Sequence, residues 1–379
     1  TWGKIISNII IMNIRYLESN IKADLEKKMV FVAGPRQVGK TTLAKRILPD
    51  NSGYLNWDIP EHREAILKRE YPPVSMIAFD EIHKFRNWRN YLKGFYDQFN
   101  DSIKTLVIGS ARLDYYRYGG DSLQGRYHYF RMLPFTAAEL KIDNEDDLEM
   151  LIKLGGFPEP FFSGSETEAR RWSREYRHLI VNEEISSLEN ISDIGSLQLL
   201  AMRLPELVGS PLSLNSLRED IQTSHKTVSR WVDILERLYM IFRIPPFGAP
   251  AIRAVKKEQK HYFYDWNTIE DAASRFENVI ALHLLKWVYF MQDSEGRNYE
   301  LRYFRDTDGR EVDFVVTDNL KPIRLIEVKT GSRNISKNLK YLKKKFPDTE
   351  AYQVSISGDH DFISAEGIRM IPALKFLSG

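Results

Sequence analysis

Five short apolar runs recur through the N-terminal part of the chain, at intervals that suit alternating strands and helices. Each run is continuous rather than alternating, a pattern typical of strands buried on both faces of a parallel sheet. In such α/β sheets ligands bind beyond the carboxyl ends of the strands, so the polar residues after each run are the candidates for chemistry. The runs occupy positions 29–32, 53–57, 74–79, 104–108 and 127–132.

The loop after the first run carries a phosphate-binding sequence. Positions 34–41 match G-x-x-x-x-G-K-[ST] in full, between an apolar run and a predicted helix at 42–48. The glycines let backbone N–H groups point at phosphate oxygens, and the helix adds the positive end of its dipole. We therefore expect ATP and Mg²⁺ as cofactors, with Lys40 bridging the outer phosphates and the Thr41 hydroxyl holding the metal. The residues expected to bind the nucleotide are Gly34, Pro35, Arg36, Gln37, Val38, Gly39, Lys40, Thr41, Thr42 and Ser110.

An acidic pair, Asp80 and Glu81, follows the third run. We expect Asp80 to bind Mg²⁺, mostly through water, and Glu81 to polarise the attacking water as general base. An acidic pair alone is often only a helix N-cap, but its place after a buried strand and downstream of the phosphate loop favours catalysis. Ser110 closes the fourth run, where it would hydrogen-bond the γ-phosphate or the water; a small residue in a turn is the alternative.

Three arginines compete for the role of stabilising negative charge in the transition state. Arg126 is the first candidate, acting across a subunit boundary in a homo-oligomer, and Arg36 and Arg112 are its rivals. The sequence does not rank them firmly. The expected catalytic residues are therefore Lys40, Glu81 and Arg126.

These segments resemble a known family, the AAA-type ATPases of archaea and bacteria that carry a C-terminal domain of uncharacterised function. The shared segments are GPRQVGKTTL, the strand ending in FDEIH, the IGSAR segment, and Gly-Arg followed by LPFTAAEL. The resemblance extends over nearly the whole chain from about Arg15 onward. It implies a five-stranded ATPase core related to the AAA+ class.

The middle of the chain has the pattern of a winged helix. Two predicted helices flank a short polar turn, and two short strands follow them, at 214–221, 226–239, 240–244 and 262–264. A basic stretch, expected between the strands, contains Arg253, Lys256, Lys257 and Lys260. Helix, turn, helix and wing form a DNA-reading arrangement, but a lid or an interaction surface is an equally good interpretation.

The C-terminal part has the acidic pattern of the restriction-endonuclease-like superfamily. A predicted helix carries Glu277, a predicted hairpin carries Asp313, and the next strand carries Glu327 and Lys329 on one face. Asp313 and Glu327 would supply hard oxygen ligands to Mg²⁺, Lys329 would orient or activate water, and Glu277 would position the site. The alternative is a nuclease-like fold kept for binding or assembly, its charges paired as Asp313–Lys329 or Glu327–Lys329.

A lysine-rich helix is predicted at 337–345. It either contacts a phosphate backbone or is a solvated helix face.

Composition narrows the class of protein only slightly. The chain has 379 residues, enough for two or three domains, and a net charge of +2, which gives no global case for nucleic-acid binding. It contains no cysteine, so disulfides and thiolate metal sites are excluded. No apolar stretch is long enough to span a membrane, so we expect a cytoplasmic protein without a membrane partner.

We expect three domains. They are an AAA+-like P-loop ATPase at 1–165, a helical lid with a winged helix at 166–268, and an α/β PD-(D/E)xK nuclease-like domain at 269–379. The leading hypothesis is a Mg²⁺-dependent ATPase that couples hydrolysis to action on DNA. The alternative is a nucleotide-dependent switch or scaffold whose nuclease-like domain is inactive.

Overall fold

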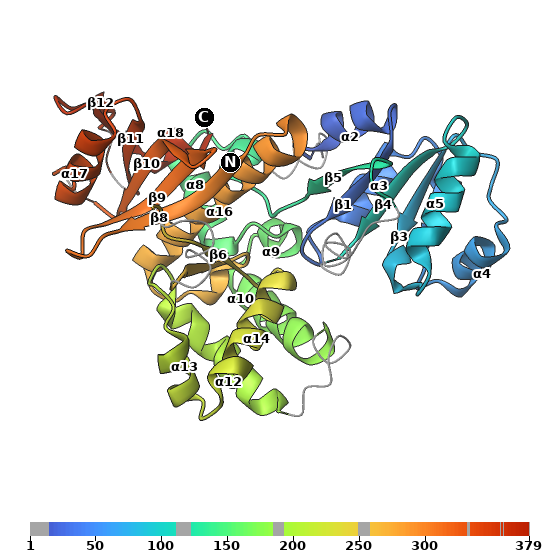
Figure 1. Cartoon of the computed structure of the whole chain (residues 1–379), viewed down its shortest axis with the longest axis horizontal. Coiled ribbons are helices and arrows are strands. Elements are labelled where there is room, and N and C mark those ends of the chain that lie inside the picture. Colours follow the sequence, from blue (N-terminus) through green and yellow to red (C-terminus); the bar gives the residue numbers. More distant parts are fainter. Residues whose placement is uncertain are drawn as a thin grey trace. The chain divides into compact units, whose positions relative to one another are not determined.

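The computed structural model describes residues 15–110, 123–184, 193–248, 258–331, 334–356, 358 and 360–378 of the chain (Figure 1). The chain divides into two compact units. The first is the N-terminal part up to Pro134, to which Arg237–Tyr239 also belong, and the second contains the other residues from Phe135 onward. The division into three domains at 165 and 268 stays a prediction.

The first unit is built on a five-stranded sheet in the order β2-β3-β4-β1-β5, in which all neighbours run parallel. Every predicted apolar run forms one of these strands, so the predicted parallel α/β core is confirmed. All residues of β1 and β3 are buried, which explains why their runs are apolar without alternation. The strands are β1 (Met29–Ala33), β2 (Tyr54–Asn56), β3 (Met76–Asp80), β4 (Lys104–Gly109) and β5 (Tyr127–Arg131).

Helices cover this sheet, as the blue and cyan part of Figure 1 shows. On one face α5 packs its apolar side chains against Phe31 and Phe79, which belong to one core cluster. Alternation along β1 directs Val30 and Val32 to the opposite face, and α2 and α3 contact the central strands. The helices are α2 (Glu18–Leu25), α3 (Lys40–Ile47), α4 (Pro60–Lys68) and α5 (Trp88–Phe99), with the 3₁₀ segments η1 (Asn51–Gly53) and η2 (Ile82–Lys84).

Helices dominate the start of the second unit. Its 24-residue helix α16 is long, yet within the described ranges no helix combines the length and the apolarity that crossing a membrane requires. The helical segments are α7 (Ala137–Leu140), α8 (Glu145–Leu154), α9 (Pro158–Ser163), α10 (Glu166–His178), the π-helical η4 (Leu179–Glu184), α12 (Ile194–Arg203), η5 (Leu204–Leu207), α13 (Leu214–Asp220), α14 (His225–Arg237), η6 (Trp266–Thr268), α16 (Ala272–Glu295), α17 (Lys337–Lys345) and α18 (Ala373–Ser378).

The helix-turn-helix and the two following strands are present as predicted. Helices α13 and α14 precede β6 (Ile241–Ile244) and β7 (Lys260–Phe263), which pair antiparallel. Of the expected basic stretch, Arg253, Lys256 and Lys257 lie outside the described residues. Lys260 was assigned wrongly to that stretch, because it is a strand residue whose side chain is only 1% exposed. The winged helix as a DNA-reading unit stays a prediction.

A six-stranded sheet forms the C-terminal part of the second unit, in the order β12-β13-β11-β10-β9-β8. Strands β8, β9 and β10 pair antiparallel, whereas β10, β11 and β13 run parallel. The predicted hairpin and the following Glu-x-Lys strand are therefore confirmed. The strands are β8 (Tyr299–Arg305), β9 (Glu311–Asp318), β10 (Lys321–Lys329), β11 (Glu350–Ser355), β12 (Phe362–Ile363) and β13 (Ile368–Pro372).

His283 is a buried histidine of α16 that holds the start of α7. Its Nε2 accepts a hydrogen bond from the Ala137 N–H at 3.0 Å, so the proton of the neutral ring lies on Nδ1, 2.8 Å from the Val279 carbonyl oxygen. Burial lowers the pKa of His283 to about 3. A second proton would disrupt the hydrogen bond to Ala137 and would place an unpaired charge in the core.

We expect the free energy of unfolding to fall on acidification. The unfolded chain protonates this histidine near its ordinary pKa of 6.5, whereas the folded chain excludes the proton down to about pH 3. The stabilising effect of the neutral ring is therefore complete above pH 6.5 and is lost as the pH falls. Between pH 7 and pH 5 the loss should be about 2 kcal/mol.

Urea unfolding at these two pH values measures this loss. His283→Gln should remove this part of the pH dependence, and the same change at the exposed His225 should leave it unaltered. A pH dependence that is identical in wild type and His283→Gln would contradict the assignment.

Candidate functional site

The loop between β1 and α3 is shaped by two glycines. A Cβ atom at Gly34 would lie 2.1 Å from the Met132 carbonyl oxygen, so a side chain cannot fit there. Gly39 adopts φ +98° and forms the N-cap of α3, a conformation that glycine adopts without strain. The guanidinium of Arg15 supports the loop from outside, because it donates hydrogen bonds to the carbonyl oxygens of Val38 (2.6 Å) and Leu133 (2.5 Å). Sequence reasoning missed Arg15.

Lys40 is a buried cation that donates hydrogen bonds to uncharged backbone groups. Its side chain donates to the carbonyl oxygens of Gly34 at 2.9 Å and Pro35 at 2.5 Å. Burial lowers the pKa of Lys40 to about 8, although the nearby carboxylates of Glu81 and Asp80 oppose that shift. An anion beside this ammonium would favour its charged form, which makes the loop a receptor for phosphate. The other predicted loop residues, Arg36, Gln37 and Thr42, lie in the loop or in the first turn of α3.

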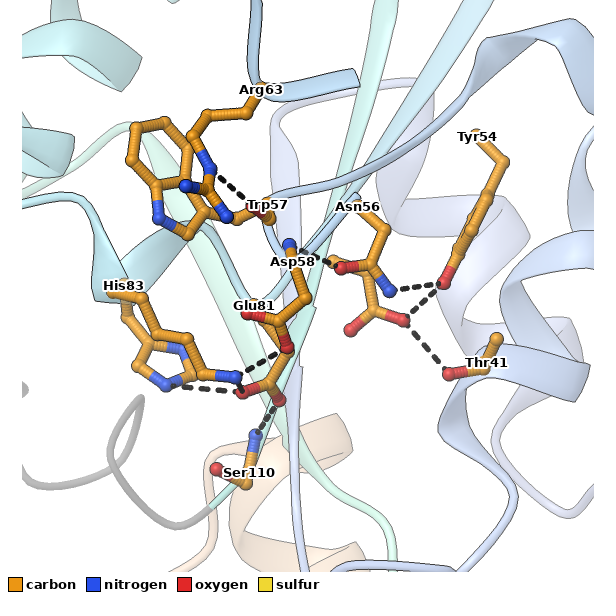
Figure 2. Close-up of polar contacts among 11 residues, drawn as sticks. Thr41, Tyr54, Asn56, Trp57, Asp58, Arg63, Glu81, His83 and Ser110 are labelled. Atoms are coloured by element: carbon orange, nitrogen blue, oxygen red, sulfur yellow. Dashed lines mark hydrogen bonds and ion pairs between the residues drawn. The ribbon is translucent and has the colours of Figure 1, made fainter. Parts of the chain in front are cut away.

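Asp80 lies at the carboxyl end of β3, where three hydroxyl or amide groups orient it. These groups belong to Thr41, Tyr54 and Asn56, which Figure 2 labels. The hydroxyls of Thr41 and Tyr54 both donate to its Oδ2, at 2.8 and 2.6 Å. The Asn56 amide donates to the Tyr54 hydroxyl at 3.1 Å. Burial raises the pKa of Asp80, and these hydroxyls act against that shift. Thr41 and Asp80 together offer the hard oxygen ligands that Mg²⁺ prefers.

Tyr54 and Asn56 are residues of the candidate site that sequence reasoning missed. They are the first and last residues of β2, which is the neighbour of β3 in the sheet. The available signal was their place in the second apolar run, but only the strand order β2-β3 brings that run to Asp80.

Glu81 is fixed by its backbone and by its carboxylate. It adopts φ +56°, and its N–H donates to the Ile108 carbonyl oxygen at 3.1 Å. Its Oε1 accepts the backbone N–H of Ser110 at 3.1 Å, and its Oε2 lies 3.2 Å from the Lys84 ammonium and 3.5 Å from His83 Nε2 (Figure 2). Burial acts to raise the pKa of Glu81, but His83, Lys84 and Lys40 outweigh it and hold that pKa below its usual value. The carboxylate is therefore ionised at neutral pH.

Ser110 contributes to this site through its backbone. Its N–H orients Glu81, while its own hydroxyl is buried and has no hydrogen-bond partner among the described residues. The predicted contact of that hydroxyl with a γ-phosphate stays a prediction.

Arg126 lies at the opposite edge of the sheet from the phosphate loop. Its carbonyl oxygen accepts the N–H of Met29, which is the first residue of β1. The phosphate loop begins after Ala33, which is the last residue of β1. Five strand residues separate these two edges by about 13 Å. Its guanidinium pairs with Asp97 at 3.0 Å. A role at the loop of its own chain is therefore not supported, and a role across a subunit boundary stays a prediction. Arg112 lies outside the described residues.

The predicted acidic residues of the second unit converge. Glu277 comes from α16, Asp313 from β9, and Glu327 and Lys329 from β10. The Val328 N–H donates to Asp313 Oδ2 at 2.8 Å, and the Lys329 ammonium pairs with Glu327 at 2.7 Å. The Glu327–Lys329 pairing is one of the two that the sequence suggested.

Three further residues complete this cluster and were missed. The Lys260 ammonium lies 2.6 Å from Glu311 Oε1, 3.7 Å from Glu277 Oε1 and 3.8 Å from Asp313 Oδ1. The Tyr262 hydroxyl donates to Glu277 at 2.8 Å. Glu311, at the start of β9, was visible in the sequence beside Asp313, but a link to β7 was not.

Burial dominates the titration of the acidic cluster. It raises the pKa of Glu277 and of Glu327 to about 7, and the neighbouring Asp313 adds to both shifts. The pKa of Asp313 is raised as well, by burial. Among the residues that the structure describes, no three acidic or histidine side chains are arranged to hold a metal ion. The metal-ligand role of Asp313 and Glu327 stays a prediction.

Comparison with known protein families divides the chain into three matched segments. An AAA domain family matches residues 26–141. Two domains of unknown function follow, DUF8612 over residues 145–270 and DUF4143 over residues 274–376.

Relatives along most of the chain come from bacteria and archaea. An uncharacterised protein of Haemophilus influenzae is 21% identical over an alignment of 351 positions, which covers 82% of this chain and 84% of that protein. An uncharacterised protein of Methanocaldococcus jannaschii is 23% identical over an alignment of 435 positions, which covers 96% of this chain and 86% of the relative.

Two solved structures are among those that match this chain. The match to the Aeropyrum pernix ORC1 protein in complex with DNA covers 71% of this chain and 93% of the ORC1 chain, with 14% identity and a TM-score of 0.35. The match to the Bacillus subtilis DNA clamp loader delta protein covers 73% of this chain and 99% of the delta chain, with 7% identity and a TM-score of 0.29.

We expect Tyr54→Phe to raise the Mg²⁺ concentration needed for ATP hydrolysis by about 10-fold, because an outer partner of a metal ligand typically contributes 10–100-fold in metal affinity. The change removes only the hydroxyl that orients Asp80 and keeps the ring. A Mg²⁺ titration of ATP turnover measures the shift. Tyr71→Phe is the matched control, since its hydroxyl contacts Tyr91 instead of Asp80. Equal Mg²⁺ midpoints in both variants would contradict a positioning role for Tyr54.

Proposed function

Because the chain belongs to a prokaryotic family of AAA-type ATPases, we propose that it is a Mg²⁺-dependent ATPase whose nucleotide cycle acts on DNA through the segments after the ATPase domain. One observation carries the ATPase proposal. Lys40, Thr41, Asp80 and Glu81 converge at the carboxyl edge of one parallel sheet.

The phosphate loop would bind the triphosphate of ATP. Lys40 would exchange its two carbonyl partners for phosphate oxygens, which compensate its buried charge far better. The N–H groups that follow Gly39 at the start of α3 would support the same anion. When bound, Mg²⁺ would neutralise charge on the outer phosphates, held by the Thr41 hydroxyl and the Asp80 carboxylate.

Glu81 would act as the general base. Its carboxylate is ionised, and the Ser110 N–H and the Lys84 ammonium fix its direction. It would accept a proton from the water that attacks the terminal phosphorus, while the bond from that phosphorus to the bridging oxygen breaks. Lys84 is itself held by Asp58 at 2.5 Å, so an ion pair outside the phosphate loop supports the base. Arg126 of a neighbouring subunit is the proposed source of a further positive charge.

The exposed start of α14 supports a role on DNA. His225, Lys226 and Arg230 are exposed on the second helix of the helix-turn-helix. In winged-helix units this helix is the one that enters the major groove. The lysine-rich helix α17 is a weaker candidate surface, because Lys340 pairs with Glu366 and Lys343 donates to the carbonyl oxygens of Pro347 and Thr349.

A second candidate function is a nucleotide-dependent switch or scaffold with an inactive nuclease-like domain. One observation favours it over a nuclease. Lys260 and Lys329 already pair with carboxylates of the acidic cluster that a nuclease would use for metal.

Two substitutions test the ATPase proposal. Lys40→Ala should abolish ATP turnover and weaken nucleotide binding, because it removes the buried cation of the loop. Glu81→Gln should retain ATP binding but lose turnover by at least about 100-fold, the size of a general-base contribution. Phosphate release and binding of a fluorescent ATP analogue measure the two effects. Normal turnover in Lys40→Ala would refute the site.

DNA binding separates the two candidate functions. At low salt the wild type should bind labelled double-stranded DNA, and the double variant Lys226→Ala, Arg230→Ala should bind about 10-fold more weakly with a shallower salt dependence. Arg170→Ala, Arg171→Ala is the matched control, since it removes two exposed positive charges from α10. No binding by the wild type at low salt, with or without ATP, would favour the switch.

A further inference from the structure

The acidic cluster of the second unit already contains a cation of its own. Lys260 belongs to β7, in the helix-turn-helix and hairpin segment, yet its ammonium lies within 4 Å of carboxylates from α16 and β9. Its side chain is 1% exposed, so water does not compensate its charge. Burial acts to lower the pKa of Lys260, but Glu277, Asp313 and Glu311 outweigh it and raise that pKa above its usual value. The lysine is therefore charged.

The oxygens around this ammonium are all engaged. Asp313 accepts the Val328 N–H through Oδ2 and faces Lys260 through Oδ1. Glu277 accepts the hydroxyl of Tyr262, which is fully buried. The other oxygen of Glu311 lies 3.6 Å from Arg305. Each of these three carboxylates therefore has a second protein partner besides Lys260.

The backbone closes the cluster from a third side. At Gly209, φ is +76°, and a Cβ atom there would lie 2.8 Å from Glu277 Oε1. The chain therefore passes directly over the Glu277 carboxylate, and a side chain at position 209 would be strained at this φ and would displace that carboxylate. A metal that bridged Glu277 and Asp313 would have to displace the Lys260 ammonium and share this space with the Gly209 backbone.

These observations disagree with a metal site built on Asp313 and Glu327. We infer that Lys260 takes the place of the metal ion in this nuclease-like domain, so that the acidic cluster is a closed ion network and the domain does not cleave phosphodiester bonds. The network joins β7 to α16 and β9, and it fixes the β6–β7 hairpin on the C-terminal sheet. On the other side Lys329 pairs with Oε1 of Glu327, whose buried Oε2 has no hydrogen-bond partner among the described residues.

Mn²⁺ binding to the full-length, nucleotide-free protein tests this inference. The Asp80→Asn variant removes the carboxylate expected to bind metal in the first unit, and electron paramagnetic resonance then counts free Mn²⁺. We expect no bound Mn²⁺ while Lys260 is present. Adding Lys260→Met should create one Mn²⁺ site per chain, because three carboxylates then lack their cation, and a further Asp313→Asn change should abolish it.

Two results would overturn the inference. One is Mn²⁺ bound by the protein that retains Lys260 and lost on Asp313→Asn. The other is a folded Lys260→Met protein that binds no Mn²⁺. Should Lys260→Met fail to fold, the first comparison decides alone, since it needs only Asp80→Asn with and without Asp313→Asn. Wild-type cleavage of DNA that disappears in Asp313→Asn would also refute it.

Thermal melting supplies a second readout. In the Asp80→Asn background, Lys260→Met should lower the melting temperature and millimolar Mn²⁺ should restore most of the loss, whereas Asp80→Asn alone should not respond. Lys286→Met is the matched control. Lys286 is also buried and pairs with Glu139, so its loss should destabilise the protein without rescue by metal. Metal rescue that is equal in both variants would count against the inference. The ATP site plays no part in this network, so either result leaves the proposed ATPase activity to be decided by the Lys40→Ala test.

Discussion

Parallel pairing of β1, β3 and β4 is the constraint on which the nucleotide site depends. In that register Asp80 lies opposite Ile108, and Ala33 lies opposite Gly109, so three strands end at the same edge. The phosphate loop, the acidic pair and Ser110 follow these ends and therefore meet. The backbone bond from Glu81 to Ile108 extends this pairing one residue past the strand and sets the direction of the candidate base. Without the parallel register the same residues would lie at opposite ends of the sheet.

Lys40 and Lys260 are both buried lysines, but their partners give them different roles. Burial penalises the charge of both, and the difference lies in their partners. Lys40 donates to two carbonyl oxygens, and its pKa falls to about 8, which leaves it able to gain from an anionic ligand. Lys260 is surrounded by three carboxylates that raise its pKa, so its charge is already compensated. The first arrangement is open to a ligand and the second is closed.

Much of the fold and of the first site could be predicted from sequence, because those signals are local. The five apolar runs, the glycine loop and the acidic pair after β3 each occupy a few consecutive residues, and all were found. Tyr54 was missed because its contact with Asp80 depends on strand order. Lys260 was assigned wrongly because its surroundings come from residues 17 to 53 positions further along the chain. Arg126 was a reasonable candidate by sequence, yet it lies at the amino edge of the sheet.

The sequence by itself determined which segments form the parallel sheet of the first unit and which loop carries the phosphate-binding pattern. These properties follow from hydrophobic pattern and from the backbone freedom of glycine, and neither needs a distant partner. Only the tertiary structure decided which charges compensate one another. The energy of a buried charge is set by the groups within a few ångströms, and for Asp80 and Lys260 those groups come mostly from other elements of the fold. The tertiary structure therefore determined that one cluster of charges can accept a ligand and that the other is already complete.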